Sequence, residues 1–193
     1  MRRRTFDALM TIAGLVLAAV LVVAGGLLTW AHSFVTDQVT TQLSAQQIYF
    51  PEAGSDSLSD PAIKPYLSQY AGQQLTTGAQ AKAYADHYIA VHISEMSQGK
   101  TYAQLSNESR ANPDDQELAA LVNTVFKGET LRGLLLNAYA FGQMATIALY
   151  GAIASFVGAA LMLILSLLGL AHLRRVPADQ EVRIGHAARA ATA

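Results

Sequence analysis

Two long stretches of this 193-residue chain are apolar and free of charged residues, and they constrain the fold more than any other feature. The first is residues 8–28, and the second lies in the uncharged run between Arg132 and Arg174. An α-helix rises about 1.5 Å per residue, so about 20 apolar residues cross the hydrocarbon core of a bilayer. The sequence therefore predicts a two-pass membrane protein with transmembrane helices over residues 8–30 and 141–173.

A cleaved secretory signal is the alternative interpretation of the first stretch. Three arginines precede it, RRTF partly matches a twin-arginine signal, and Ala31-His32-Ser33 is a passable small-x-small cleavage site. However, the 21 residues of this stretch exceed the roughly 7–15 apolar residues of a signal peptide. The helical spacing of apolar side chains also continues into the polar residues 33–50. We therefore expect an uncleaved anchor.

Charge is distributed unevenly about the two stretches. The two ends of the chain carry seven basic and three acidic residues, whereas the part between the stretches carries six basic and eleven acidic residues. Cytoplasmic flanks of membrane helices carry an excess of Lys and Arg. The sequence thus predicts that residues 1–7 and the tail 174–193 are cytoplasmic and that residues 31–140 lie outside. Trp30 stands at the predicted outer boundary, where aromatic side chains are common.

The predicted extracytoplasmic domain shows helix signals and no strand-like alternation. The first membrane helix is expected to continue outward to Pro51, and a loop follows over residues 51–60. Capping residues, prolines and glycines then predict four short helices, over residues 61–71, 79–97, 102–111 and 113–127. The predicted fold class is all-α, with two transmembrane helices extended outward and capped by a small helical domain.

The stretch YADHYIAVHISEM, which begins at Tyr84, gathers the side chains most capable of chemistry. His87 and His92 are five residues apart, so on a regular helix they point roughly 140° away from each other and cannot bind one metal ion together. Tyr84, Tyr88 and His92 instead share a broad face, and Glu95 lies beside His92. We expect a hydrogen-bonded His92–Glu95 pair on the buried side of the helix, which makes these four residues a structural element first and a candidate switch or pocket second.

Other chemistry has little support in the sequence. The chain contains no cysteine, which excludes disulfides and thiolate metal sites. It also shows neither a glycine-rich phosphate loop nor a Gly-x-Ser-x-Gly elbow. A metal site in which His32 or another acidic residue completes the His92–Glu95 pair stays open as an alternative. We expect no catalytic residue, no cofactor and no nucleic-acid partner.

Small residues recur within the second apolar stretch. Gly151, Ser155 and Ala159 lie at positions i, i+4 and i+8, and Gly158 is adjacent to Ala159. Small residues at this spacing let helix backbones approach closely in a membrane. This pattern predicts that the two membrane helices pack on each other, or that the second one packs on another copy of the chain or on a foreign subunit.

Three runs of the sequence, AYADHYIAVHISEM, TYAQLS and FKGETLRGLLLNAYAFGQM, resemble a set of two-pass membrane proteins from actinobacteria. The resemblance covers nearly the whole chain. Some members of that set carry the name aromatic ring-opening dioxygenase, which implies two histidines and a carboxylate on an Fe(II) ion with open positions. His32, His87 and His92 are all predicted outside the membrane, and no such triad can be assembled from neighbouring residues. The resemblance therefore carries no functional residue over to this chain.

These observations favour a non-enzymatic integral membrane protein of the cytoplasmic membrane. Its partners would be the lipid bilayer and either a protein of a membrane or cell-envelope complex or a second copy of the chain, bound through the membrane helices or the extracytoplasmic domain. The alternative is a membrane-anchored sensor of a ligand or of pH that signals through its helices to the basic tail. An enzyme is the third hypothesis.

Overall fold

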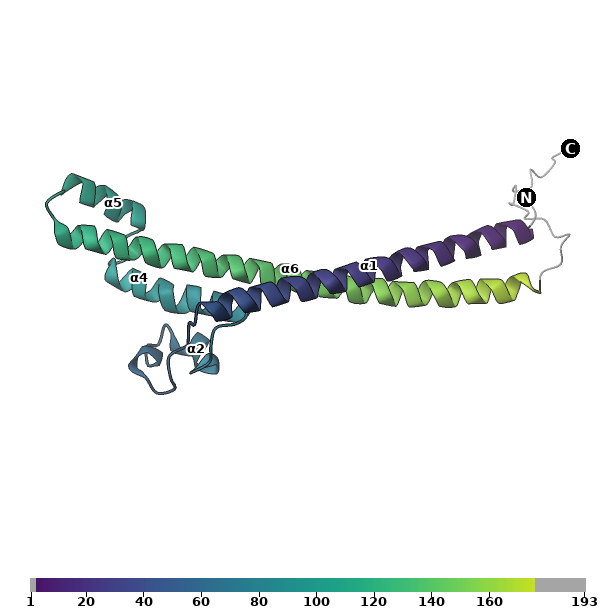
Figure 1. Ribbon diagram of the computed structural model, residues 1–193, viewed down its shortest axis with the longest axis horizontal. Helices are drawn as coiled ribbons and strands as arrows, with labels where there is room; N and C mark the ends of the chain where they lie inside the picture. Colours follow the sequence, from purple (N-terminus) through teal and green to yellow (C-terminus); the bar gives the residue numbers. More distant parts are fainter. Residues whose placement is uncertain (1–2, 176–193) are drawn as a thin grey trace, which may run out of the picture. The chain divides into compact units, whose positions relative to one another are not determined.

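The computed structural model describes residues 3–175, and within that range helices joined by turns and loops account for the chain, with one isolated antiparallel bridge between Tyr49 and Gln74 (Figure 1). The helices are α1 (Arg3–Ala45), α2 (Lys64–Leu67), α3 (Gly78–Tyr84), α4 (Ala90–Met96), α5 (Tyr102–Ala111) and α6 (Gln116–Leu173). Single turns of 3₁₀-helix form η1 (Asp56–Leu58) and η2 (Ser68–Tyr70), and a π-helical turn forms η3 (Ala85–Ile89). The structure confirms the predicted all-α class with two long apolar helices.

Each of the two long helices is long and apolar enough to cross a membrane. α1 has 43 residues and α6 has 58, which correspond to about 65 Å and about 87 Å, against roughly 30 Å for a bilayer core. Their large apolar side chains are mostly exposed, including Leu27, Ile147 and Leu168 at more than 60%. A continuous exposed apolar surface marks a face made for another apolar phase or partner.

Packing divides the chain into two compact units. The first comprises Met1–Thr29 and Leu149–Ala193, and the second comprises Trp30–Ala148. The boundary on α1 lies beside the predicted end of the first membrane segment, and the boundary on α6 lies eight residues beyond the predicted start of the second. The predicted membrane limits themselves stay predictions. The tail beyond Arg175 lies outside the described residues.

In the first unit, α1 and α6 pack through small residues that recur every seven positions. The buried residues are Thr11, Ala18 and Gly25 on α1 and Ala152, Ala159 and Ser166 on α6. A seven-residue repeat keeps one face of a helix against its partner along a left-handed supercoil. Small side chains at these positions allow the two backbones to lie close together.

Two glycines show how close this approach is. A methyl group on Gly14 would lie 2.5 Å from the hydroxyl of Ser166, and one on Gly25 would lie 2.9 Å from the ring of Phe156. The position on α6 falls as the position on α1 rises, so the two helices run antiparallel in this unit. No side chain fits at either glycine without displacing its neighbour.

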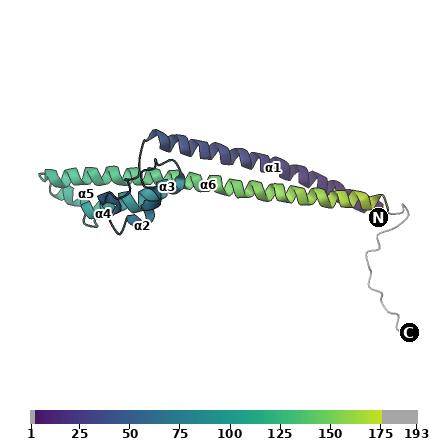
Figure 2. The same ribbon diagram turned by 90° about the horizontal axis from the view of Figure 1, so that it is seen from below.

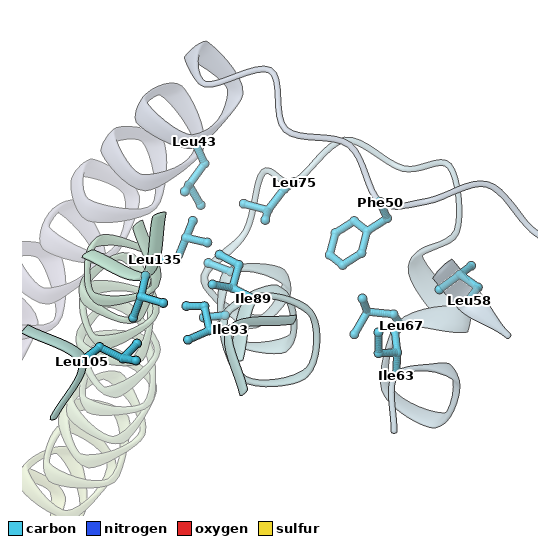
Figure 3. Close-up of a cluster of buried hydrophobic side chains, with 13 residues drawn as sticks. Leu43, Phe50, Leu58, Ile63, Leu67, Leu75, Ile89, Ile93, Leu105 and Leu135 are labelled. Carbon is cyan, nitrogen blue, oxygen red and sulfur yellow. The ribbon is translucent and has the colours of Figure 1, made fainter. Parts of the chain in front are cut away.

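The second unit has a hydrophobic core of its own, to which its helices and its loops contribute (Figure 3). Leu43 of α1, Leu135 of α6 and Ile93 of α4 point toward one another, while Phe50 and Leu67 pack in the part of the core farther from α6. Leu67 is fully buried, and full burial of such a side chain contributes roughly 1.5–3 kcal/mol. Figure 2 shows α4 and α5 alongside the first part of α6, where they cover this core.

Either Thr76 or Thr77 is expected to cap the helix after Gly78, and Thr101 the next one; the structure shows Thr77 and Thr101 as the caps. Each threonine hydroxyl accepts a hydrogen bond from the backbone N–H three residues later, at 3.3 Å in each case. The side-chain carbonyls of Gln80 and Gln104 accept the backbone N–H of their threonine in return, at 3.0 and 2.9 Å. These reciprocal capping boxes fix the starts of α3 and α5, each typically worth about 1 kcal/mol.

The predicted outward extension of the first helix to Pro51 is too long, because α1 ends at Ala45. Gln47 adopts a left-handed φ of 52°, which stops the helix. The chain then pairs with a later loop, where the N–H of Phe50 donates to the carbonyl of Gln73 at 2.9 Å. The ring of Phe50 is buried in the core, and this burial outweighs continuation of the helix.

The two helices predicted over residues 61–71 and 113–127 also start later than expected. Asp60 caps a turn, through the N–H of Ala62 at 2.7 Å, and α2 begins only at Lys64. Asn112 ends α5, and the true cap of α6 is Asp115, whose carboxylate accepts the N–H of Leu118 at 2.9 Å. The proline after Asn112 favours the turn between Asn112 and Asp115, in which the N–H of Asp115 donates to the carbonyl of Asn112 at 3.1 Å.

The predicted break at Gly128 does not exist, since α6 runs unbroken through it. A methyl group at Gly128 would lie 2.7 Å from Cδ1 of Ile93. The glycine is therefore needed for the close packing of α4 on α6 rather than for a helix end. Its neighbour Gly133 on the same helix has open space around it.

Candidate functional site

The candidate residues lie on a helical segment that is less regular than predicted. α3, η3 and α4 follow one another without a break from Gly78 to Met96, and the turn Ala85–Ile89 is π-helical. A π turn adds a residue to the helix and is frequent at functional sites. The prediction of one regular helix over residues 79–97 missed this turn because periodicity in sequence does not report a single inserted residue.

An aromatic row runs from the loops of the second unit to α4. Tyr70 packs on Phe50 with ring centroids 5.1 Å apart, and Phe50 meets Tyr84 edge to face at 5.4 Å. Tyr84 and Tyr88 follow at 4.7 Å, and Tyr88 and His92 at 4.4 Å. Each such aromatic contact contributes about 0.5–1.5 kcal/mol beyond burial. The structure thus brings three predicted residues together and adds Phe50 and Tyr70, which local periodicity could not connect to them.

His92 forms its hydrogen bond within its own helix. Its Nδ1 lies 2.7 Å from the carbonyl oxygen of Tyr88, so this nitrogen carries the hydrogen in the bond. Glu95 is exposed. The expected buried His92–Glu95 pair is therefore corrected, because a carboxylate keeps its hydration at the helix surface rather than lose it beside a half-buried imidazole.

The surroundings of Tyr84 change the acidity of its phenol. Burial raises the pKa of Tyr84 to about 12, and the neighbouring Tyr88 adds to the shift. The phenol therefore stays protonated at physiological pH. Its chemistry is that of a packed aromatic ring with a hydroxyl, and it is not that of a general base.

Asp86, on the π turn, anchors this segment to α6. One carboxylate oxygen lies 2.5 Å from Nζ of Lys82, and the other lies 3.4 Å from Nη2 of Arg132. Arg132 also lies 3.4 Å from the carboxylate of Glu129. The hydrogen bond from Lys82 lowers the pKa of Asp86 and raises the pKa of Lys82. Sequence reasoning missed this network, since 46 residues separate Asp86 from Arg132.

The two histidines of the segment have different neighbours. The imidazole of His87 stacks on the ring of Tyr66, with centroids 3.5 Å apart and an interplanar angle of 4°. His92 contacts Tyr88 instead, and His32 points to α6, with Nδ1 2.8 Å from the carbonyl of Ala145. Among residues 3–175, no three His, Cys, Asp or Glu side chains gather where they could hold a metal ion.

The four small residues predicted to pack in the membrane have unequal roles in the first unit. Ala159 is buried, and methyl groups on Gly151 and Gly158 would lie 3.1 and 3.3 Å from leucine side chains of α1. Ser155 is only half-buried. Three of the four residues thus lie in the contact with α1, at the seven-residue spacing that a long antiparallel pair needs to keep one face in contact.

Comparison of the chain with protein-family models, curated proteins and solved structures finds no match. The resemblance to actinobacterial two-pass proteins therefore stays a prediction, and function has to be argued from the residues themselves.

Proposed function

We propose that the chain is a two-pass protein of the cytoplasmic membrane, with both ends in the cytoplasm and the domain between the membrane helices on the outer face. Two helices of sufficient length and apolar character support this placement. The excess of basic residues at the two ends of the chain supports the orientation.

We further propose that the protein is a non-enzymatic accessory or scaffold that binds a partner in a membrane or cell-envelope complex through its extracytoplasmic domain. The observation that carries this proposal is the use of the candidate side chains. His92 bonds to its own helix, His87 stacks on Tyr66, and Asp86 is held by two cations. Side chains engaged in this way order the domain and present its outer surface in one shape.

An exposed aromatic pair marks where a protein partner would bind. Tyr102 of α5 and Phe126 of α6 lie with ring centroids 5.5 Å apart, and they are 40% and 51% exposed. Two acidic residues, Asp114 and Asp115, are exposed in the turn that joins these helices. Aromatic side chains are enriched at the centres of protein interfaces, and acidic neighbours would favour a basic partner surface.

Quantitative affinity purification of the full chain in mild detergent tests this proposal. The variant Tyr102→Ser/Phe126→Ser should lose the co-purified protein, while Tyr49→Ser, which changes another exposed aromatic residue, should retain it. Repeated recovery of the chain without any other protein would refute the proposal. Equal recovery of the same protein by both variants would place the partner surface elsewhere and refute the assignment to the aromatic pair.

A further inference from the structure

The second unit contains an open apolar groove of about 480 Å³ between the outer part of α1 and the middle of α6. It is lined by Phe34, Val35, Gln38, Val39 and Gln42 of α1 and by Ala138 and Phe141 of α6. All seven of these described residues are uncharged, and only the two glutamines can form side-chain hydrogen bonds. The volume lies in the range of about 300–1,000 Å³ that small-molecule sites occupy.

The size of the groove decides between kinds of occupant. A stable protein interface engages about 20–30 residues on each side, against the seven that line this groove. The seven lining residues therefore match a slender apolar chain better than a protein surface.

The position of the groove indicates where such a chain would come from. Trp30, at the expected outer boundary of the membrane, stacks on Phe34 with ring centroids 5.5 Å apart. Phe34 is itself part of the groove lining, so an apolar surface continues from the boundary into the groove. On α6, the lining residues Ala138 and Phe141 come before Gly151, which lies against Leu28 of the first apolar stretch.

We propose that this groove binds one acyl chain of a membrane phospholipid from the outer leaflet, and this inference rests on the membrane placement proposed above. Burial of the acyl chain against Val35, Val39 and Phe141 supplies the affinity, at roughly 0.8 kcal/mol for each buried methylene group. The absence of charge in this lining matches an uncharged chain.

Photo-crosslinking of the full chain tests the inference. The protein is placed in nanodiscs of phosphatidylglycerol and phosphatidylethanolamine in which a fraction of the lipid carries a diazirine on its acyl chain, and adducts are mapped by mass spectrometry. Adducts on residues 34–42 should fall several-fold in Gln38→Trp, which fills the groove. They should persist in Thr36→Trp, which adds the same side chain at an exposed position of α1 outside the lining.

Adducts on residues 8–28 distinguish the two levels of the proposal. If they form while residues 34–42 remain unmodified, the membrane placement stands and the lipid site is refuted. If residues 8–28 are also unmodified, the membrane placement itself fails. Equal groove adducts in Gln38→Trp and Thr36→Trp would refute the site. A disulfide between two Phe141→Cys chains that abolishes the lipid adducts would also refute it, because it would assign the groove to a second copy of the chain.

Discussion

Replacing Gly128 by leucine should destabilise the second unit, whereas the same change at Gly133 should not. Both glycines lie inside α6, so each substitution removes a poor helix former and gains about 0.8–1 kcal/mol in helix propensity. At Gly128 the new side chain starts 2.7 Å from Ile93, in the packed contact between α4 and α6. Overpacking of this kind costs about 1–3 kcal/mol, so the two variants should differ by about 1–3 kcal/mol.

Hydrogen exchange of the full chain in mild detergent measures this difference where it arises. The side chain of Ile93 packs against Gly128, and Ile93 belongs to the helical segment Gly78–Met96. The backbone amides of this segment should therefore exchange faster in Gly128→Leu than in Gly133→Leu. Because every 1.4 kcal/mol is a factor of ten, the expected ratio of exchange rates is about 5- to 150-fold. Equal protection of these amides in the two variants would refute the close packing assigned to Gly128.

Three further changes test other parts of the structure. In the first unit, Gly25→Leu should lower the thermal stability of the detergent-solubilised chain relative to Gly26→Leu, because only Gly25 faces a packed side chain; the opposite order would contradict the antiparallel seam. The pKa of Asp86 is lowered, so its stabilising contribution is present above its ordinary value of 3.8 and is lost as the pH falls through the lowered value in the folded state. Acid unfolding of the second unit should therefore be less steep in Asp86→Asn, which should cost at most about 1 kcal/mol at neutral pH, and an unchanged acid profile would exclude the network. The pKa of Tyr84 is raised to about 12, so its contribution to stability is intact below pH 10 and is lost as the pH rises toward 12. In an ultraviolet titration, Tyr84→Phe should lack one tyrosine that ionises near pH 12. Loss of a tyrosine that ionises near pH 10 would contradict this burial.

The features that could be predicted from the sequence are those that depend on neighbouring residues. The two apolar stretches needed only composition and length, and the helix starts near residues 79 and 102 needed only a threonine in the capping position. The all-helical class followed from the same local signals. These signals are local because a helix satisfies its backbone hydrogen bonds within itself.

The features that could not be predicted depend on partners distant in the chain. Phe50 leaves the helix because a core formed by later segments buries its ring. Local sequence predicts a helix stop at Gly128, whereas its role depends on Ile93, which packs against it. Asp86 lies on the π turn and pairs with Arg132, 46 residues later, which no local pattern encodes. The candidate site differs from the prediction for a local reason, since Nδ1 of His92 bonds to the carbonyl of Tyr88 four residues earlier and Glu95 is exposed.

The central claim, that the chain crosses the membrane twice and exposes residues 31–140 outside, can be tested directly by cysteine labelling, since the sequence contains no cysteine. Single cysteines are introduced as Thr5→Cys and Ser59→Cys, both at exposed positions, and intact cells are treated with a membrane-impermeant maleimide. We predict that the cysteine at position 59 is labelled in intact cells and that the one at position 5 is labelled only after permeabilisation. Labelling at position 5 alone in intact cells would show the opposite orientation in the membrane. Recovery of the chain in the soluble fraction would contradict the membrane placement.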